Sequence, residues 1–136
     1  MSFSTKAEIA APAARVWSIL IDTSLWPVWG PSLRGVAGAG RFIDAATQGR
    51  LQTAFGIWLS FEIDHFEDGR YWSWRVAGVP ATGHRVEPLG RNRCRLRFEV
   101  PTLAAPYLAV CRVACRRIRA MAEGMQAVGD GPRVVG

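Results

Sequence analysis

The stretch LAAPYLAVCRVACRRIRAMAEGM, residues 103–125, decides how the rest of the chain folds. Its apolar residues recur at spacings of three and four, the period of one face of an α-helix. They are Leu103, Tyr107, Val110, Cys111, Ala114, Ile118, Met121 and Met125. Pro101 ends whatever precedes the helix, and Pro106 suits its first turn, where a missing N–H costs least. We therefore expect a helix of about five to six turns, with a broad apolar face that a sheet must cover.

The residues before Pro101 are expected to supply that sheet, beginning with a half-buried strand at residues 2–9. Apolar and polar side chains alternate there, with Ile9 on the inward side. A helix is expected at residues 13–22, opened by Pro12 and buried along Val16, Trp17, Leu20 and Ile21. A second short helix or turn at residues 25–33 carries Trp26 and Trp29, and a short strand follows near residues 34–37.

An antiparallel meander is expected from residue 48 onward. Residues 48–54 alternate weakly, and Ile57, Leu59, Phe61 and Ile63 form the inward face of the next strand. Asp68-Gly69 predicts a type I′ hairpin turn, which needs a positive φ at both central residues. The implied cross-strand pairs are Phe61 with Val76, Ile63 with Trp74, His65 with Trp72, and Glu62 with Arg75 as an ion pair.

Two further turns continue the meander. Gly78-Val79-Pro80 leads into a strand at residues 82–89. Gly90-Arg91-Asn92 forms a three-residue loop, with Asn92 in the left-handed position, and leads into a strand at residues 93–100. Cys94, Leu96, Phe98 and Val100 point inward there, and Glu87 faces Arg95. We expect one domain over residues 1–128 and a loose Gly/Pro-rich tail at residues 129–136.

Composition excludes several classes of function. The chain has 136 residues and a formal net charge of +6, and all of its 17 basic residues except Lys6 are arginine. These arginines are scattered, which predicts weak anion binding rather than a nucleic-acid site. Cys94, Cys111 and Cys115 are odd in number, which favours free thiols and a cytoplasmic location. No apolar run suits a signal peptide or a stable membrane insertion, and no His/Cys spacing suits a metal, so no cofactor is expected.

Nearly the whole chain resembles a known family, in its order of strand, two short helices, meander and long C-terminal helix, and the most specific residues lie near its start. The residues that carry the likeness are Ile9-Ala-Ala-Pro12, Val16-Trp17, Asp22 and Trp26-Pro-Val-Trp-Gly-Pro31. They resemble the opening signature of the START-like (SRPBCC) superfamily, of the polyketide cyclase/dehydrase and lipid-transport type. The resemblance implies an α+β helix-grip fold, in which a curved antiparallel sheet of about seven strands wraps on the long C-terminal helix, with two short helices after the first strand. Members of this superfamily enclose an apolar cavity that binds lipids, sterols, polyketides, quinones or plant hormones, and only some catalyse a reaction.

Inward side chains of the meander and the last helix therefore indicate a pocket, because ligand pockets are mostly apolar with a few polar groups. The expected ligand is a small hydrophobic or aromatic molecule of the lipid, polyketide or quinone kind, held in a central cavity for carriage, sequestration or sensing. The candidate ligand-binding residues are Trp29, Phe61, His65, Trp72, Trp74, His84, Phe98, Tyr107 and Cys111.

Two alternatives remain open from the sequence. In the first, the protein is a cyclase or dehydratase that uses His84 as its acid or base, with Tyr107 polarising a carbonyl. No inward carboxylate is expected to orient that histidine, since Glu62, Asp64 and Glu87 all fall on outward phases. In the second, the protein is an interaction module whose cavity is filled by its own side chains.

Overall fold

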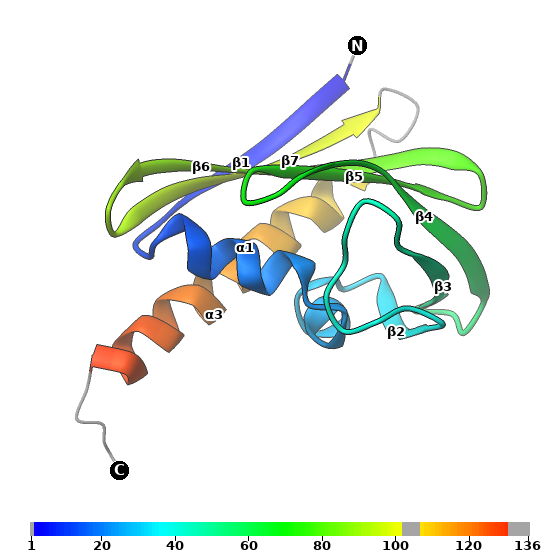
Figure 1. Ribbon diagram of the computed structural model, residues 1–136, viewed down its shortest axis with the longest axis horizontal. Coiled ribbons are helices and arrows are strands. Elements are labelled where there is room, and N and C mark those ends of the chain that lie inside the picture. Colours follow the sequence, from blue (N-terminus) through cyan, green and yellow to red (C-terminus); the bar gives the residue numbers. More distant parts are fainter. Residues whose placement is uncertain (1, 102–106, 131–136) are drawn as a thin grey trace.

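The structure is a computed structural model that describes residues 2–101 and 107–130. Its elements are β1 (Ser2–Ile9), α1 (Ala13–Ile21), the 3₁₀ helix η1 (Thr23–Leu25), α2 (Trp26–Trp29), β2 (Leu33–Ala37), β3 (Gln48–Thr53), β4 (Trp58–Glu67), β5 (Tyr71–Val76), β6 (Val79–Gly90), β7 (Arg93–Pro101) and α3 (Leu108–Asp130). The seven strands form one antiparallel sheet in the order β1-β7-β6-β5-β4-β3-β2. Figure 1 shows α1 and α3 lying across one face of this sheet. The predicted fold class is confirmed.

Helix α3 has the apolar face that its period predicts. Cys111, Ala114, Cys115, Ile118 and Ala122 are buried on it, and the helix packs mainly against β1. The predicted start of the helix at Leu103 and Pro106 lies outside the described residues. Helix α3 runs on through Gly129 and Asp130, where the loose tail was expected to begin, and the rest of that tail also lies outside the described residues. No helix in the described part of the chain is both long and apolar enough to cross a membrane.

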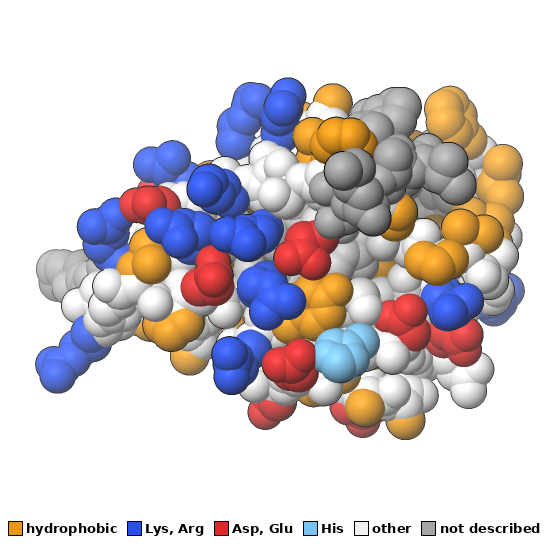
Figure 2. Space-filling view, turned by 90° about the horizontal axis from the view of Figure 1, so that it is seen from above, with side chains coloured by type: hydrophobic (Ala, Val, Ile, Leu, Met, Phe, Trp, Pro, Cys, Tyr) orange, Lys and Arg blue, Asp and Glu red, His pale blue; other side chains and the backbone are white. Residues whose placement is uncertain are grey.

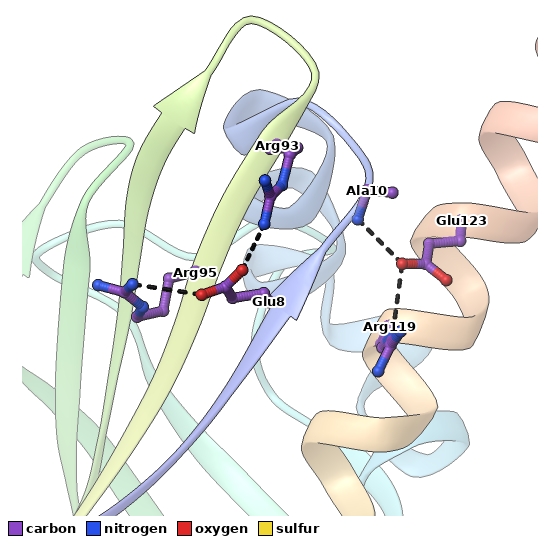
Figure 3. A network of polar contacts seen from close by, with 6 residues as sticks. All are labelled: Glu8, Ala10, Arg93, Arg95, Arg119 and Glu123. Carbon is purple, nitrogen blue, oxygen red and sulfur yellow. Dashed lines mark hydrogen bonds and ion pairs between the residues drawn. The ribbon is translucent and has the colours of Figure 1, made fainter.

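Polar contacts fasten the edge of the sheet to α3, as Figure 3 shows. The Glu123 carboxylate accepts a hydrogen bond of 2.9 Å from the backbone N–H of Ala10, just after β1. It also accepts one from Arg119, one helical turn earlier. On the outer face, Glu8 of β1 pairs with Arg93 and Arg95 of β7. The arginines of β7, Arg93, Arg95 and Arg97, thus make cross-strand ion pairs on the outer face of the sheet.

Two hydrogen-bonded side chains set the path of the chain between α1 and β2. The Asp22 carboxylate caps η1 by accepting from the Ser24 backbone N–H at 3.0 Å, and it pairs with Arg41 at 3.1 Å. The Trp26 indole N–H donates to the carbonyl oxygen of Leu20 at 2.8 Å. These contacts explain the spacing of Asp22 and Trp26 in the opening motif, because together they aim the Trp26 ring under the sheet.

The predicted register of the β4–β5 hairpin is confirmed near its open end and is wrong near its turn. Phe61 pairs with Val76 and Ile63 with Trp74, as predicted, but His65 pairs with Ser73 instead of Trp72. The register shifts between Ile63 and His65, so a β-bulge at Asp64 turns His65 to the outer face. The predicted ion pair also changes: Arg75 pairs with Asp64 at 3.6 Å, although its Cα partner is Glu62.

The turn types differ from those predicted. Positive φ occurs at Gly69 but not at Asp68, so their turn is not type I′. The type I′ pattern lies instead at Ala77 and Gly78, with φ values of 54° and 78°, and β6 therefore begins at Val79. Asn92 has no positive φ, and the loop before β7 is shorter than predicted because Gly90 pairs with Arg93. The predicted pairing of the two strands beyond this loop is confirmed, because Glu87 lies opposite Arg95.

Candidate ligand pocket

A cluster of aromatic rings fills the centre of the fold. Trp26 stacks on Trp72 with ring centroids 5.4 Å apart and meets Trp74 and Phe61 edge-on at 5.2 and 5.5 Å. On the other side of Trp72, the His84 ring stacks at 3.8 Å. The free space beside His84 has a volume of only about 20 Å³, close to the minimum that one water molecule needs. The middle of the protein is therefore packed core.

The hydrogen bonds around His84 form a chain with a defined direction. The Trp74 indole N–H donates to Thr82 Oγ1 at 2.8 Å, and this oxygen lies 3.1 Å from His84 Nε2. His84 Nδ1 lies 3.1 Å from the carbonyl oxygen of Trp72. A carbonyl only accepts, so Nδ1 carries the proton and Nε2 accepts from the Thr82 hydroxyl. Both ring nitrogens are thus occupied within the protein.

Burial also keeps His84 uncharged. It lowers the pKa of the imidazole to about 3, and the hydrogen bond to the Trp72 carbonyl opposes this only in part. The ring is therefore neutral at pH 7. His84 makes no hydrogen bond to Tyr107, because Thr82 and the Trp72 carbonyl take both of its ring nitrogens.

The buried histidine makes stability depend on pH. Above about pH 6.5 the ring is neutral in both the folded and the unfolded chain, so its burial carries no protonation penalty. As the pH falls from there towards 3, the unfolded chain binds a proton that the folded protein excludes. We expect the free energy of unfolding to drop by up to about 1.4 kcal/mol per pH unit in this window. Urea unfolding at a series of pH values measures this dependence. For His84→Gln, which keeps a donor and an acceptor but cannot titrate, the free energy of unfolding should fall less steeply as the pH drops. Equal dependence on pH in the two proteins would contradict a neutral buried ring.

A pocket of about 540 Å³ opens at the end of the sheet, next to this core. The turns β3–β4 and β5–β6, the start of β2 and the end of β7 meet at this end, which is on the right in Figure 1. The lining side chains are Ser32, Leu33, Leu51, Thr53, Ala54, Phe55, Ile57, Leu59, Trp74, Val76, Val79, Pro80, Ala81, Thr82, Val100, Pro101 and Tyr107. Four hydroxyl groups interrupt an otherwise apolar wall, and none of these lining residues is charged.

Trp74 and Thr82 belong both to the pocket and to the narrow space beside His84. The hydrogen bond between them fixes the Trp74 ring as the inner wall of the pocket. At the mouth, the hydroxyls of Tyr107 and Ser32 lie 2.5 Å apart, and Tyr107 is 37% exposed. Burial of its phenol raises the pKa of Tyr107, so that the hydroxyl stays protonated at neutral pH.

The candidate binding residues lie in four places. Trp74 and Tyr107 line the pocket. Phe61 and Trp72 belong to the aromatic core, while Trp29, His84, Phe98 and Cys111 surround the small space beside it. The inward placement predicted for His65 is wrong, because the bulge at Asp64 leaves it exposed and paired with Glu67 at 2.7 Å.

Several pocket residues were missed by sequence reasoning. Phe55 sits in the β3–β4 turn and Val79 is the first residue of β6, both where the period-two pattern has stopped, and Leu51 lies on a strand that alternates only weakly. The position of Trp26 at the centre of the core was also missed. Its place in the motif shared with the START-like superfamily was the available signal.

A curved antiparallel sheet closed by a long C-terminal helix, with an apolar pocket at one end, defines a helix-grip protein. The model of the family described as polyketide cyclase / dehydrase and lipid transport matches residues 1–129, and the chain belongs to that family. No curated protein sequence gives a significant match.

Solved structures with the same fold include the Zhui aromatase/cyclase from Streptomyces sp. R1128, with a TM-score of 0.72 and 16% identity over 96% of this chain and 98% of that one. A START superfamily protein from Mycobacterium smegmatis has a TM-score of 0.70 and 18% identity, over 91% and 98% of the two chains. Norcoclaurine synthase from Thalictrum flavum has a TM-score of 0.64 and 11% identity, over 89% and 92%. At these identities the likeness concerns the fold alone.

Proposed function

We propose that this protein binds a small, uncharged and mainly apolar molecule in the pocket at the end of the sheet, and holds it for carriage, sequestration or sensing. The observation that carries this proposal is the pocket of about 540 Å³ with an uncharged lining, beside a core that is already full. This volume lies within the range of about 300–1,000 Å³ that is typical of small-molecule sites. An ionised ligand group would meet no counter-charge on the lining and would lose its hydration.

The hydroxyl groups indicate how a polar end of the ligand would be held. Thr82 gives its proton to His84 and is not free to donate. In the Ser32–Tyr107 pair, one hydroxyl donates to the other, and the acceptor keeps a proton of its own. That proton suits a carbonyl or hydroxyl oxygen of the ligand at the pocket mouth, while the apolar body lies against Leu51, Leu59 and Trp74.

An enzymatic function finds less support in the chemistry of the site. Two of the similar structures are named as an aromatase/cyclase and a synthase, so catalysis is a natural alternative for this fold. Acid–base catalysis needs a group whose pKa lies near the working pH. The His84 pKa lies far below 7, and burial raises the pKa of the Cys111 thiol to about 11. A binding role requires none of these groups to titrate.

Matched tryptophan substitutions distinguish the pocket from the core. Ala81 lines the pocket, whereas Ala114 lines only the small space beside His84. We expect Ala81→Trp to abolish binding of the neutral fluorescent probe N-phenylnaphthylamine while changing the midpoint of urea unfolding little. Ala114→Trp should cost about 1–3 kcal/mol through overpacking and leave probe affinity unchanged. Probe binding that survives Ala81→Trp but is lost with Ala114→Trp would move the site to the core and contradict the proposal.

A further inference from the structure

Large apolar side chains stand exposed around the mouth of the pocket. Phe55 in the β3–β4 turn is 91% exposed, and Ile57 beside it is 58% exposed. Val79, at the β5–β6 turn, is 60% exposed. All three also line the pocket, so one opening lies among them. Figure 2 shows apolar side chains gathered at this end of the molecule, on the right. We call these three residues the apolar rim.

The rim has no structural explanation within the described residues. Burying a side chain of this size is worth roughly 1.5–3 kcal/mol, so three neighbours left in water are unfavourable unless a partner covers them. The side chains come from the tips of two separate hairpins, and they project from an end of the sheet. Such projecting tips suit a soft, penetrable surface better than a flat protein interface.

Two arginines lie beside the rim. Arg34 and Arg50 are both exposed, and among the described residues neither has a carboxylate partner. Gly56 lies at the tip of the β3–β4 turn, and Arg34 Nη1 is 3.4 Å from the position that a Cβ atom would take there. The Arg50 guanidinium lies 5.3 Å from the ring centre of Trp58. Residues 30–37, 50–60 and 76–82, which surround the mouth, contain no Asp or Glu.

We propose that the apolar rim and its two arginines dock the protein on the surface of an anionic lipid bilayer. Phe55, Ile57 and Val79 enter the boundary between headgroups and acyl chains, and the arginines contact the lipid phosphates. The pocket then opens directly onto the hydrocarbon region, so an apolar molecule can pass between bilayer and protein without crossing water. Docking extends the proposed function but does not require an occupied pocket.

Vesicle co-sedimentation with the full chain tests the docking. We expect binding to vesicles of phosphatidylcholine mixed with phosphatidylglycerol at low salt, and much weaker binding to phosphatidylcholine alone. Phe55→Ser should weaken binding by at least about tenfold. Leu89 is an exposed apolar residue next to the β6–β7 turn. Leu89→Ser should therefore leave vesicle binding unchanged.

Two double variants that each remove two positive charges test the contribution of the arginines beside the rim. Arg34→Gln with Arg50→Gln should weaken binding by about fivefold for each arginine removed. Arg91→Gln with Arg112→Gln removes the same charge from exposed positions elsewhere and should have a much smaller effect. Equal losses in the two double variants, or equal binding to neutral and anionic vesicles, would overturn the proposal.

Tryptophan fluorescence gives a second readout. Trp58 is 44% exposed, whereas the other five tryptophans are buried. We expect anionic vesicles to shift the emission of Trp58 to shorter wavelength and brominated acyl chains to quench it. The Trp58→Phe variant should lose this response but still sediment with vesicles. A failure to sediment with anionic vesicles would overturn the proposal. A concentration-dependent dimer that Phe55→Ser abolishes would also overturn it, because the partner of the rim would then be a second copy of this chain. Probe binding in the pocket is measured without lipid, so the two proposals can fail independently.

Discussion

Replacing Trp26 with alanine is expected to lower the free energy of unfolding by about 3–5 kcal/mol, the range for truncating a large buried aromatic side chain. Trp26 is completely buried and contacts Trp72, Trp74 and Phe61. Its loss also leaves the Leu20 carbonyl oxygen without its indole donor. Urea unfolding followed by far-ultraviolet circular dichroism measures the change.

The matched control is Trp58→Ala, which removes the same side chain from the outer face of the sheet. Trp58 is 44% exposed and contacts Arg50 through its ring, a contact worth about 0.5–1 kcal/mol at an exposed site. We expect a loss of stability of that size. A similar effect of the two substitutions would show that Trp26 does not hold the core together.

The second large effect is expected for Thr82→Val, which keeps the shape of the side chain but removes its hydroxyl. Trp74 Nε1 would lose its acceptor and His84 Nε2 its donor, both in a dry environment. Each buried group left unsatisfied costs roughly 1–3 kcal/mol. The Trp74 ring would also lose the hydrogen bond that holds it as the inner wall of the pocket, so affinity for N-phenylnaphthylamine should fall.

Thr82→Ser is the control for this change, because it keeps the hydroxyl and removes only a methyl group. It should retain most of the stability and the probe affinity. If Thr82→Val unfolds at the same urea concentration as the unmodified protein, the hydrogen-bond chain from Trp74 to Trp72 does not contribute as described.

The order and type of the main elements could be predicted because each follows from a local pattern. The three-and-four spacing of Cys111, Ala114 and Ile118 predicts α3, and the alternation from Cys94 to Val100 predicts β7 with its inward face. Details that depend on neighbouring strands could not be predicted in this way. The bulge at Asp64 arises where β4 and β5 adjust to each other, and a single strand carries no sign of it.

The place of the pocket depends on volumes that a sequence pattern does not contain. Trp72 and Trp74 were predicted to face a central cavity, and both do face inward. Trp26, the first residue of α2, packs against both rings, which also contact each other, and the three indoles close the centre. The remaining space opens at the end of the sheet, where Ile57 was assigned to a buried strand face but is more than half exposed at the mouth.

Ligand binding at the end of the sheet is tested most directly by a titration of methyl-labelled protein with N-phenylnaphthylamine, followed by nuclear magnetic resonance. Leu51, Leu59 and Val76 line the pocket, whereas Val86, Leu96 and Ile118 are buried in the core outside it. Binding at the end of the sheet should give saturable shifts of the three pocket residues' methyl groups, with those of the three core residues nearly unchanged. Shifts centred on the core residues Val86, Leu96 and Ile118, or no saturable shift of the pocket residues, would contradict binding at the end of the sheet.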